Sequence, residues 1–219
     1  MSLYVIATPI AHPDDMTLRG IHILKNCQYI IGEEAKTCRA QLKSWDISPQ
    51  DKTILLLNEH SKSEDLKELL EVCHTHDVAL ISDCGTPGFC DPGADLIDLC
   101  YKSNIKVTTI PGPSSLMTFL SMLGTQWKEF TFKGFPPRET NERIEFFKTL
   151  AKAPHPQCFL EAPYRLHATL EHLEQYCSNK KIYLGINLTA ENQEFYKGSI
   201  KDIRKKVKAQ KAPFIVGLE

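Results

Sequence analysis

Residues 78–93, VALISDCGTPGFCDPG, decide the fold of this chain. The four apolar residues 78–81 predict a buried strand, and the Gly, Pro, Asp and Thr residues that follow predict a loop. Asp91 followed by Pro92 is typical of a helix N-cap and a first helical residue, so we expect a helix near 92–102. Ligands of open α/β sheets bind at the carboxyl ends of such strands. For this loop alone, a tight turn without a ligand is the alternative.

The same order of strand and helix extends to both sides of this stretch. Further strands are predicted at 3–9, 28–32, 53–58 and 106–110, with helices at 38–45, near 63–73 and at 116–123, and another over residues 18–24 that Asp14 or Asp15 can cap. The apolar runs are continuous rather than alternating, which favours a mainly parallel sheet covered on both faces. A similar Pro-Gly-rich turn at 111–115 follows the strand at 106–110.

A second series of elements begins after residue 124. Its strands, at 130–132, 158–160, 182–186, 194–196 and 213–216, contain more Tyr, Phe and polar residues, and its helices are expected at 141–152, 165–177 and 201–208. The closely spaced strands around Asn192 favour antiparallel pairing. We therefore expect an α/β protein of two α/β domains. Residues 1–124 form the first, with a mainly parallel sheet and helices on both faces, and residues 125–219 form the second, with a mixed sheet.

Composition excludes several classes of protein. The 219 residues carry a formal net charge of −1, so the chain as a whole lacks a basic field for nucleic acid. A local basic run remains near the end, and it reads either as a patch or as a solvated helix face: Lys201, Arg204, Lys205, Lys206, Lys208 and Lys211. No apolar run approaches 18 residues and no basic leader precedes residues 3–7, so we expect neither a membrane span nor a signal peptide, and a cytoplasmic location.

The eight cysteines do not predict a metal site. No pair has the two-residue spacing of zinc ligands, and most lie in apolar segments where a reduced core thiol is expected. Cys84 and Cys90 flank the central loop, and chelation by this pair is the alternative to a plain loop.

Three common cofactor and nucleophile motifs are absent. The chain has no P-loop, no Gly-x-Gly-x-x-Gly after its first strand and no Gly-x-Ser-x-Gly elbow. Its glycines combine with prolines instead, at 85–88, 91–93 and 111–113. Such loops suit a small ligand that is bound by main-chain groups.

Five segments together carry a family resemblance. Residues 3–10, 81–93, 111–115, 134–137 and 161–166 resemble the tetrapyrrole methylase superfamily, and within it the branch that contains ribosomal RNA small subunit methyltransferase I. The resemblance spans essentially the whole chain in the right order. It implies an S-adenosylmethionine-dependent methyltransferase, usually a homodimer, with a cofactor cleft between two α/β domains. It also implies ribosomal RNA as the partner, methylated on a ribose 2′-hydroxyl of the small subunit.

The resemblance implies cofactor-binding residues in both domains. From the first domain these are Pro9, Asp83, Gly85, Thr86, Pro87, Asp91, Ser114 and Ser115; from the second they are Glu161, Asn187, Leu188, Ala212 and Pro213. The sequence departs from the branch where acceptor-facing segments are expected: Ala11-His12-Pro13 replaces Gly-Asn-Leu, and residues 32–39 and 186–190 also differ.

Methyl transfer to a hydroxyl requires a group that meets the hydroxyl proton. The foremost candidates are His12, Glu33 and Glu34, and further candidates are Asp14, Asp15 and Glu161. Arg39, Arg138 and Arg143 either meet RNA phosphates or are solvated surface residues. Two other functions stay open: a methyltransferase of the same fold with a small acceptor such as a tetrapyrrole, and a cofactor-binding module without transfer activity.

Overall fold

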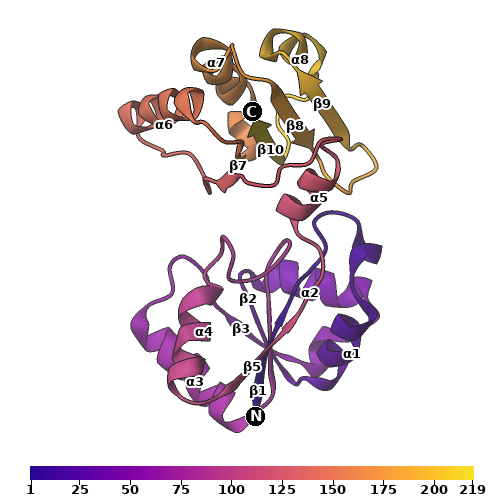
Figure 1. The fold of residues 1–219 in the computed structure, drawn as a ribbon. Helices are drawn as coiled ribbons and strands as arrows, with labels where there is room; N and C mark the ends of the chain where they lie inside the picture. Colours follow the sequence, from indigo (N-terminus) through magenta and orange to yellow (C-terminus); the bar gives the residue numbers. More distant parts are fainter. The chain divides into compact units, whose positions relative to one another are not determined.

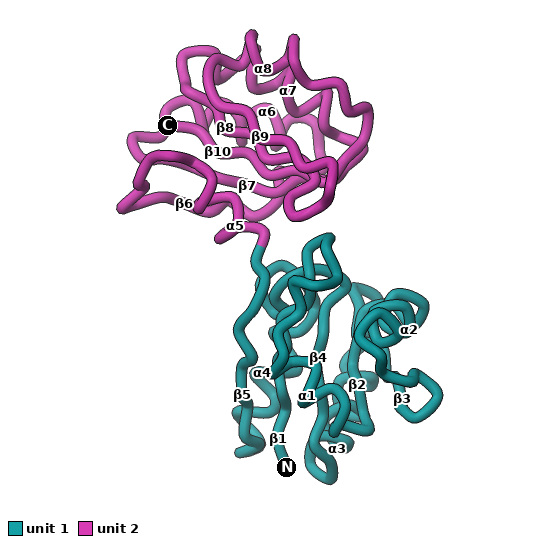
Figure 2. The backbone as a smooth tube through the Cα atoms, turned by 90° about the vertical axis from the view of Figure 1, so that its right-hand side faces the viewer, with its two compact units in different colours: residues 1–114 teal, residues 115–219 magenta.

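The computed structural model describes residues 1–219 and divides into two compact units, Met1–Ser114 and Ser115–Glu219 (Figure 2). Each unit contains one five-stranded sheet, with strand order β3-β2-β4-β1-β5 in the first and β6-β7-β10-β8-β9 in the second. The α/β class and the two sheets are therefore confirmed.

The first unit alternates strands and helices along the chain (Figure 1). Its strands are β1 (Ser2–Ile6), β2 (Tyr29–Gly32), β3 (Thr53–Leu56), β4 (Val78–Ile81) and β5 (Lys106–Ile110), and all of them pair in parallel. Its helices are α1 (Leu18–Asn26), α2 (Ala35–Ser44), α3 (Ser63–Thr75) and α4 (Gly93–Lys102), with short 3₁₀ turns at Pro13–Asp15 and Pro49–Asp51.

Alternate residues of the central strands face opposite layers of helices. On β1, Ile6 packs in a cluster with Leu24 of α1 and Leu42 of α2. Its neighbour Val5 belongs to a second cluster with Leu69 of α3 and Leu96 of α4. The strands are thus buried on both faces, as their continuous apolar runs predict.

Two helix starts differ from the expected capping residues. The Thr17 side chain caps α1 by accepting a hydrogen bond from the Gly20 N–H at 3.0 Å, whereas Asp14 and Asp15 lie in the preceding 3₁₀ turn. Helix α4 begins at Gly93, one residue later than expected. Asp91 is therefore outside the N-cap position, and its carboxylate accepts a hydrogen bond from the Gly88 N–H.

The second unit holds a mixed sheet. Its strands are β6 (Thr131–Phe132), β7 (Gln157–Glu161), β8 (Ile182–Ile186), β9 (Glu194–Gly198) and β10 (Phe214–Leu218). Its helices are α5 (Ser115–Ser121), α6 (Thr140–Lys152), α7 (Leu166–Tyr176) and α8 (Ile200–Lys206), with a 3₁₀ turn at Pro163–Arg165. Strand β6 is parallel to β7, whereas β10 is antiparallel to both β7 and β8, and β8 is antiparallel to β9 as the sequence predicts.

Helix α5 belongs to the second unit, although the sequence places it before the expected boundary at residue 124. Its side chain Phe119 is fully buried in a cluster with Tyr183 of β8 and Ile215 of β10. On the other face of this sheet, α6, α7 and α8 cover a separate cluster that includes Phe147, Leu170 and Ile203. Leu116 of α5 lies in the same cluster as Phe119, in agreement with the division of the units after Ser114.

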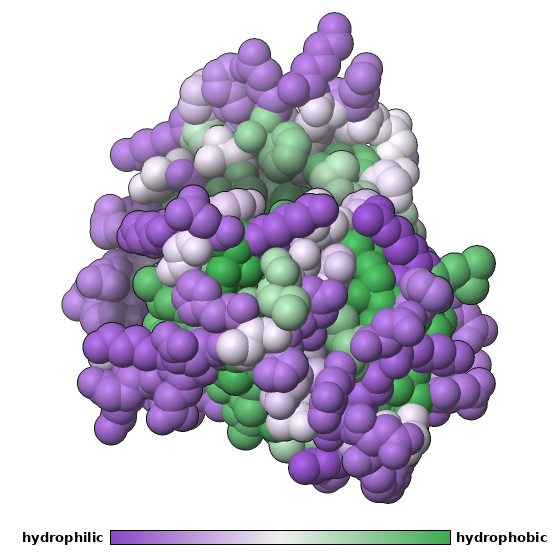
Figure 3. Space-filling view, turned by 90° about the horizontal axis from the view of Figure 1, so that it is seen from below, coloured by the Kyte–Doolittle hydropathy of each residue, from purple (hydrophilic) through white to green (hydrophobic).

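No helix of this protein is long and apolar enough to cross a membrane. Hydrophilic residues cover most of the face in Figure 3, with smaller apolar areas between them. All eight cysteines are free thiols, and six of them are buried, whereas Cys84 and Cys90 are exposed. No group of three His, Cys, Asp or Glu side chains is placed to hold a metal ion.

Candidate functional site

Three loops meet at the carboxyl ends of the central strands of the first unit. The loop after β1 joins the loop after β4 through a pair of backbone hydrogen bonds between Thr8 and Gly85, at 2.8 and 3.2 Å. The loop after β4 joins the loop after β5 through the Thr86 hydroxyl, which donates to the Pro113 carbonyl at 3.0 Å. The structure thus brings together the first-unit loops that the resemblance implies for the cofactor, including the buried residues Pro9 and Pro87.

Buried hydroxyls fix the start of the 83–91 loop. The Thr8 Oγ1 donates to the Ser82 carbonyl at 3.0 Å, and the Ser82 Oγ donates to the Gly85 carbonyl at 3.0 Å. Both side chains are almost fully buried, at 0% and 2% exposed. Because an unmade hydrogen bond at a buried group costs about 1–3 kcal/mol, these bonds hold the loop in one conformation.

Two glycines in the loop have backbone conformations that other residues rarely adopt. Gly85 has φ +83° and Gly88 has φ +77°, in the left-handed region. At the neighbouring turn, a Cβ on Gly112 would lie 3.1 Å from the Ala7 Cβ. Glycine at these places therefore sets the course and the close approach of the loops.

Carboxyl groups gather around the same loop. The Glu33 Oε1, just after β2, accepts a hydrogen bond from the Asp83 N–H at 2.9 Å. Burial raises the pKa of Glu33, with the charges of Asp83 and Asp91 adding to the effect and the hydrogen bond opposing it. Burial also raises the pKa of Asp83 and of Asp91. A cation bound beside these groups would favour their ionised forms.

Sequence reasoning missed one residue of this site. The Gln41 side chain, on α2, donates to the Asp83 carbonyl at 2.9 Å and to the Ser82 carbonyl at 3.3 Å. An isolated Gln in a helix carries no signal for this contact, because its partner lies more than 40 positions away in the sequence.

The predicted residues of the second unit lie at one edge of its sheet. Phe214, at the start of β10, is in register with Glu161 at the end of β7 and with Ile186 at the end of β8. Directly beyond this row, the Asn187 N–H donates to the Pro213 carbonyl at 2.9 Å, and Asn187 has φ +50°. The side chains of Leu188 and Ala212 are buried in the two clusters of the unit.

Glu161 and Arg143 form a buried ion pair. The Glu161 Oε2 lies 2.6 Å from the Arg143 Nη1, with side chains 3% and 8% exposed, although this contact lacks hydrogen-bond geometry at Oε2. The other oxygen of Glu161 accepts from the Ala162 N–H at 2.7 Å. The Arg143 Nη2 donates to the buried Thr169 hydroxyl at 2.9 Å. Arg143 is therefore neither a solvated surface residue nor placed to meet an RNA phosphate.

The catalytic candidates lie in different environments. His12 is exposed, and its Nδ1 accepts a hydrogen bond from the Asp14 N–H at 3.3 Å. Glu34 is exposed and accepts from the Thr37 hydroxyl at 2.6 Å. Asp14, Asp15, Arg39 and Arg138 are exposed as well. Of the three foremost candidates, only Glu33 is both partly buried and bonded to the 83–91 loop.

Comparison with solved structures defines the class of the fold. The chain superposes on diphthine synthase with a TM-score of 0.78 at 10% identity, covering 99% of this chain and 88% of that one. It superposes on the methyltransferase CobJ with a TM-score of 0.69 at 14% identity, covering 99% and 92%. A third match is uroporphyrin-III-C-methyltransferase from Thermus thermophilus, with a TM-score of 0.64 at 13% identity and coverage of 99% and 93%. At these identities the likeness shows the fold alone, a two-sheet α/β fold found in methyltransferases.

Comparison of sequences then gives the family. Residues 2–204 match the family model of the tetrapyrrole (corrin/porphyrin) methylases, and this chain belongs to that family. It is an enzyme of the methyltransferase class, and this function is better supported than a binding module without transfer activity. Methyltransferases of the family use S-adenosylmethionine.

Curated relatives cover most of the chain and carry one name, ribosomal RNA small subunit methyltransferase I. The relative from Hydrogenobaculum sp. (strain Y04AAS1) is 34% identical over 95% of this chain and 90% of its own length. The relative from Thermotoga maritima is 30% identical over 91% and 89%. The relative from Streptococcus pyogenes serotype M3 is 32% identical over 92% and 70%.

Proposed function

We propose that this protein transfers the methyl group of S-adenosylmethionine to a ribose 2′-hydroxyl of small-subunit ribosomal RNA. The observation that carries the proposal is the identity of 30–34% over more than 90% of the chain to relatives with that rRNA methyltransferase name. The solved structures that carry other names are only 10–14% identical and share the fold. A ribosomal RNA acceptor is therefore better supported than a tetrapyrrole.

The residues of the first unit fit such a cofactor. Its sulfonium and ammonium groups are cationic, and the 83–91 loop carries the carboxyl groups of Asp83 and Asp91, whose pKa values are raised by burial. The glycine conformations at 85 and 88 leave main-chain groups of the loop without a Cβ beside them. We propose that these loops hold the cofactor, together with Pro9 and Ser114 in this unit and, in the second unit, Ser115 and the edge formed by Glu161, Asn187, Leu188, Ala212 and Pro213.

Glu33 is the candidate that best suits the proton transfer. When bound, S-adenosylmethionine supplies an electrophilic methyl group; the hydroxyl oxygen supplies the electron pair of the new bond, and the hydroxyl proton needs an acceptor. A raised pKa makes the Glu33 carboxylate a stronger base than an ordinary glutamate. His12 is less suited, because its Nδ1 already accepts the Asp14 N–H, so the neutral ring carries its proton on Nε2. Glu34 is exposed, where water competes for its charge.

The cofactor part of the proposal is tested by ligand-dependent unfolding. S-adenosylmethionine at about 100 times its Kd is expected to add roughly 2.7 kcal/mol to the free energy of unfolding. Adenosine triphosphate at the same concentration is the control. A shift with the nucleotide and none with S-adenosylmethionine would contradict the proposal.

The acceptor part is tested with methyl-labelled S-adenosylmethionine. Small ribosomal subunits from a strain that lacks this gene are expected to take up label in their RNA, at a nucleotide whose 3′ phosphodiester then resists alkaline cleavage. Subunits from the parent strain, already methylated, are the control. Label in a small-molecule fraction of the cell extract, with none in RNA, would favour the tetrapyrrole-like alternative.

We also propose that the protein works as a homodimer in the cytoplasm, where ribosomal subunits are found. Light scattering after gel filtration measures the mass directly, and a mass near the 24.8 kDa of one chain would refute the dimer.

A further inference from the structure

Basic side chains concentrate in one segment of the second unit. Residues 201–211 contain six Lys or Arg residues and one Asp, a net charge of +5, whereas the whole chain carries −1, so the remaining residues carry −6. We use the name α8 lysine patch for its five lysines, all of them exposed: Lys201, Lys205, Lys206, Lys208 and Lys211. The net charge of the whole chain therefore does not reveal the strong local positive charge of this segment.

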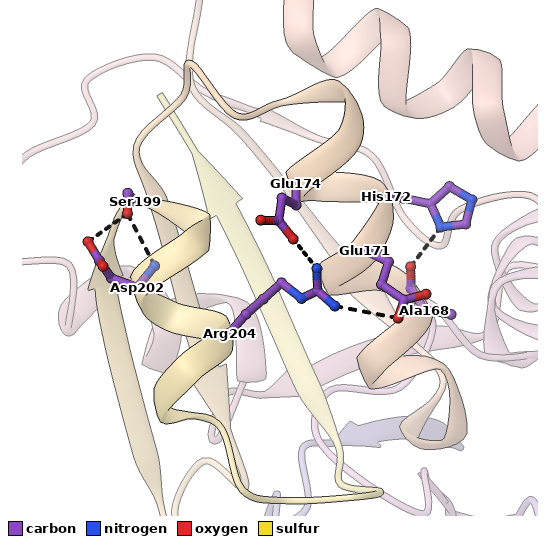
Figure 4. Close-up of polar contacts among 7 residues, drawn as sticks. All are labelled: Ala168, Glu171, His172, Glu174, Ser199, Asp202 and Arg204. Carbon is purple, nitrogen blue, oxygen red and sulfur yellow. Dashed lines mark hydrogen bonds and ion pairs between the residues drawn. The ribbon is translucent and has the colours of Figure 1, made fainter.

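The patch stands on a fixed support. The apolar face of α8 is buried through Ile200, Ile203 and Val207, which leaves its charged side chains in solvent. Arg204 reaches from α8 to α7, where its guanidinium pairs with Glu174 and lies 3.5 Å from Glu171 (Figure 4). This contact joins α8, which carries Lys201, Lys205 and Lys206, to α7.

The one arginine of the segment has acidic partners, and the five lysines have none. Lysines elsewhere in the chain do pair with acids: Lys102 with Asp98 at 2.6 Å, and Lys148 with Glu145 at 2.7 Å. Lys201 and Lys205 line a shallow hollow together with Arg204 and Glu174. The lysine charges of the patch are therefore available to an outside anion.

Helix stability explains only part of this arrangement. Lys205 and Lys206 lie in the last turn of α8, where cations favour the helix dipole. Lys208 and Lys211 lie beyond the helix, on the segment that leads to Ala212 and Pro213, so the dipole does not account for them. The Pro213 carbonyl accepts the Asn187 N–H at the sheet edge that we assign to the cofactor. The basic segment thus runs along the chain directly into the proposed site.

We propose that the α8 lysine patch binds the phosphate backbone of the RNA acceptor and positions it for transfer. This inference rests on the proposed function, because the acceptor must be a polyanion. Lysines that meet phosphates supply affinity and register without reading the base sequence. An RNA strand carries one phosphate at every nucleotide, so it can meet charges that are spread over eleven residues.

The test compares two triple variants with equal change of charge. Lys205→Gln/Lys206→Gln/Lys208→Gln removes three charges from the patch, and Lys25→Gln/Lys67→Gln/Lys152→Gln removes three lysine charges elsewhere. Binding of a fluorescein-labelled single-stranded RNA is measured by anisotropy at several salt concentrations, and circular dichroism checks the fold. If each patch lysine meets one phosphate, the slope of log K against log salt falls by about 2 and affinity at 0.1 M salt falls roughly 10- to 100-fold. The control variant keeps the slope of the wild type.

Methyl transfer to unmethylated small ribosomal subunits gives the second readout. The patch variant is expected to raise KM for the subunits with kcat unchanged, while its shift in unfolding with S-adenosylmethionine stays that of the wild type. A patch variant that matches the wild type in slope and KM would overturn the inference and leave the proposed function standing. Equal losses of RNA affinity in the two triple variants would also overturn the inference, because they would show that only the net charge of the protein matters. Wild-type protein that binds S-adenosylmethionine but neither binds nor methylates RNA would overturn both the acceptor and the patch.

Discussion

The buried ion pair between Arg143 and Glu161 allows a sharp prediction about the second unit. Arg143→Met removes the guanidinium that lies 2.6 Å from the Glu161 Oε2 and leaves that carboxylate with almost no access to water. Loss of one partner of a buried pair costs about 3–5 kcal/mol. The substitution also removes the donor to the Thr169 hydroxyl, which is fully buried. We therefore expect the free energy of unfolding of this unit to decrease by an amount in the upper part of that range.

The double variant Arg143→Met/Glu161→Gln separates charge from packing. The amide oxygen that the second substitution introduces can still accept the Ala162 N–H, and no charge is left buried. Replacement of both charges of a buried pair is often close to neutral, so we expect the double variant to recover most of the lost stability. If Glu161 contacts the cofactor as proposed, the same variant stays impaired in S-adenosylmethionine binding even though it is stable.

The assay uses the two tryptophans of the chain, one in each unit. In a Trp45→Phe background, fluorescence reports Trp127 alone, whose Nε1 donates to the Glu219 carboxylate at 2.7 Å in the second unit. Urea unfolding in this background follows the second unit without assuming that both units unfold together. An Arg143→Met loss below about 1 kcal/mol, or a double variant no more stable than the single one, would refute the reasoning.

Three further substitutions test the loops of the first unit. Thr8→Val removes the hydroxyl that donates to the Ser82 carbonyl at 3.0 Å. Urea unfolding followed by Trp45 fluorescence in a Trp127→Phe background is expected to show that the free energy of unfolding of the first unit decreases by about 1–3 kcal/mol. An unchanged free energy of unfolding would mean that this hydrogen bond is dispensable. Gly85→Ala places a Cβ at φ +83°, at a cost of about 1–2 kcal/mol, and calorimetry is expected to show weaker binding of S-adenosylmethionine. Wild-type affinity would contradict the proposal that the 83–91 loop holds the cofactor. Glu33→Gln is expected to abolish methyl transfer with S-adenosylmethionine binding kept, whereas Glu34→Gln stays active. The pKa of Glu33 is raised in the folded state, so the folded wild type binds this proton more tightly than the unfolded chain does. Its free energy of unfolding therefore increases as pH falls through the folded-state pKa toward 4.5, and Glu33→Gln lacks this contribution. Identical plots of unfolding free energy against pH for the two proteins would contradict the raised pKa.

The sequence predicts the elements of both units well, because each has a local signal. Every strand and α-helix expected from apolar runs and turn residues is present, with ends that differ by a few residues. Contacts between distant segments have no such signal. The units divide earlier than expected for that reason: α5 looks like the last helix of the first series, but its buried side chains Leu116 and Phe119 lie in the cluster of the second unit.

The candidate site divides in the same way. Loops rich in Gly and Pro mark themselves in the sequence, and the structure does bring those after β1, β4 and β5 together. The side chains that support these loops cannot be recognised in the sequence, because nothing local distinguishes Gln41 or Thr8 from other residues of their type. Arg143 is misleading, because an arginine beside acidic residues in a helix looks exposed, whereas its guanidinium is buried against Glu161.

The contrast between loops with a local sequence signal and side chains without one explains why the loops identify the family but not the acceptor. The first-unit loops are held by main-chain bonds between Thr8 and Gly85 and by a positive φ at Gly85, and few residues satisfy such conditions. The residues that depart from the branch at 11–13 are exposed, and there a change of side chain leaves the loop bonds intact. The solved structures with other names share the fold at only 10–14% identity, so the fold by itself does not identify the acceptor. In this chain, the exposed side chains that we propose to favour an anionic acceptor are the five lysines of the α8 lysine patch.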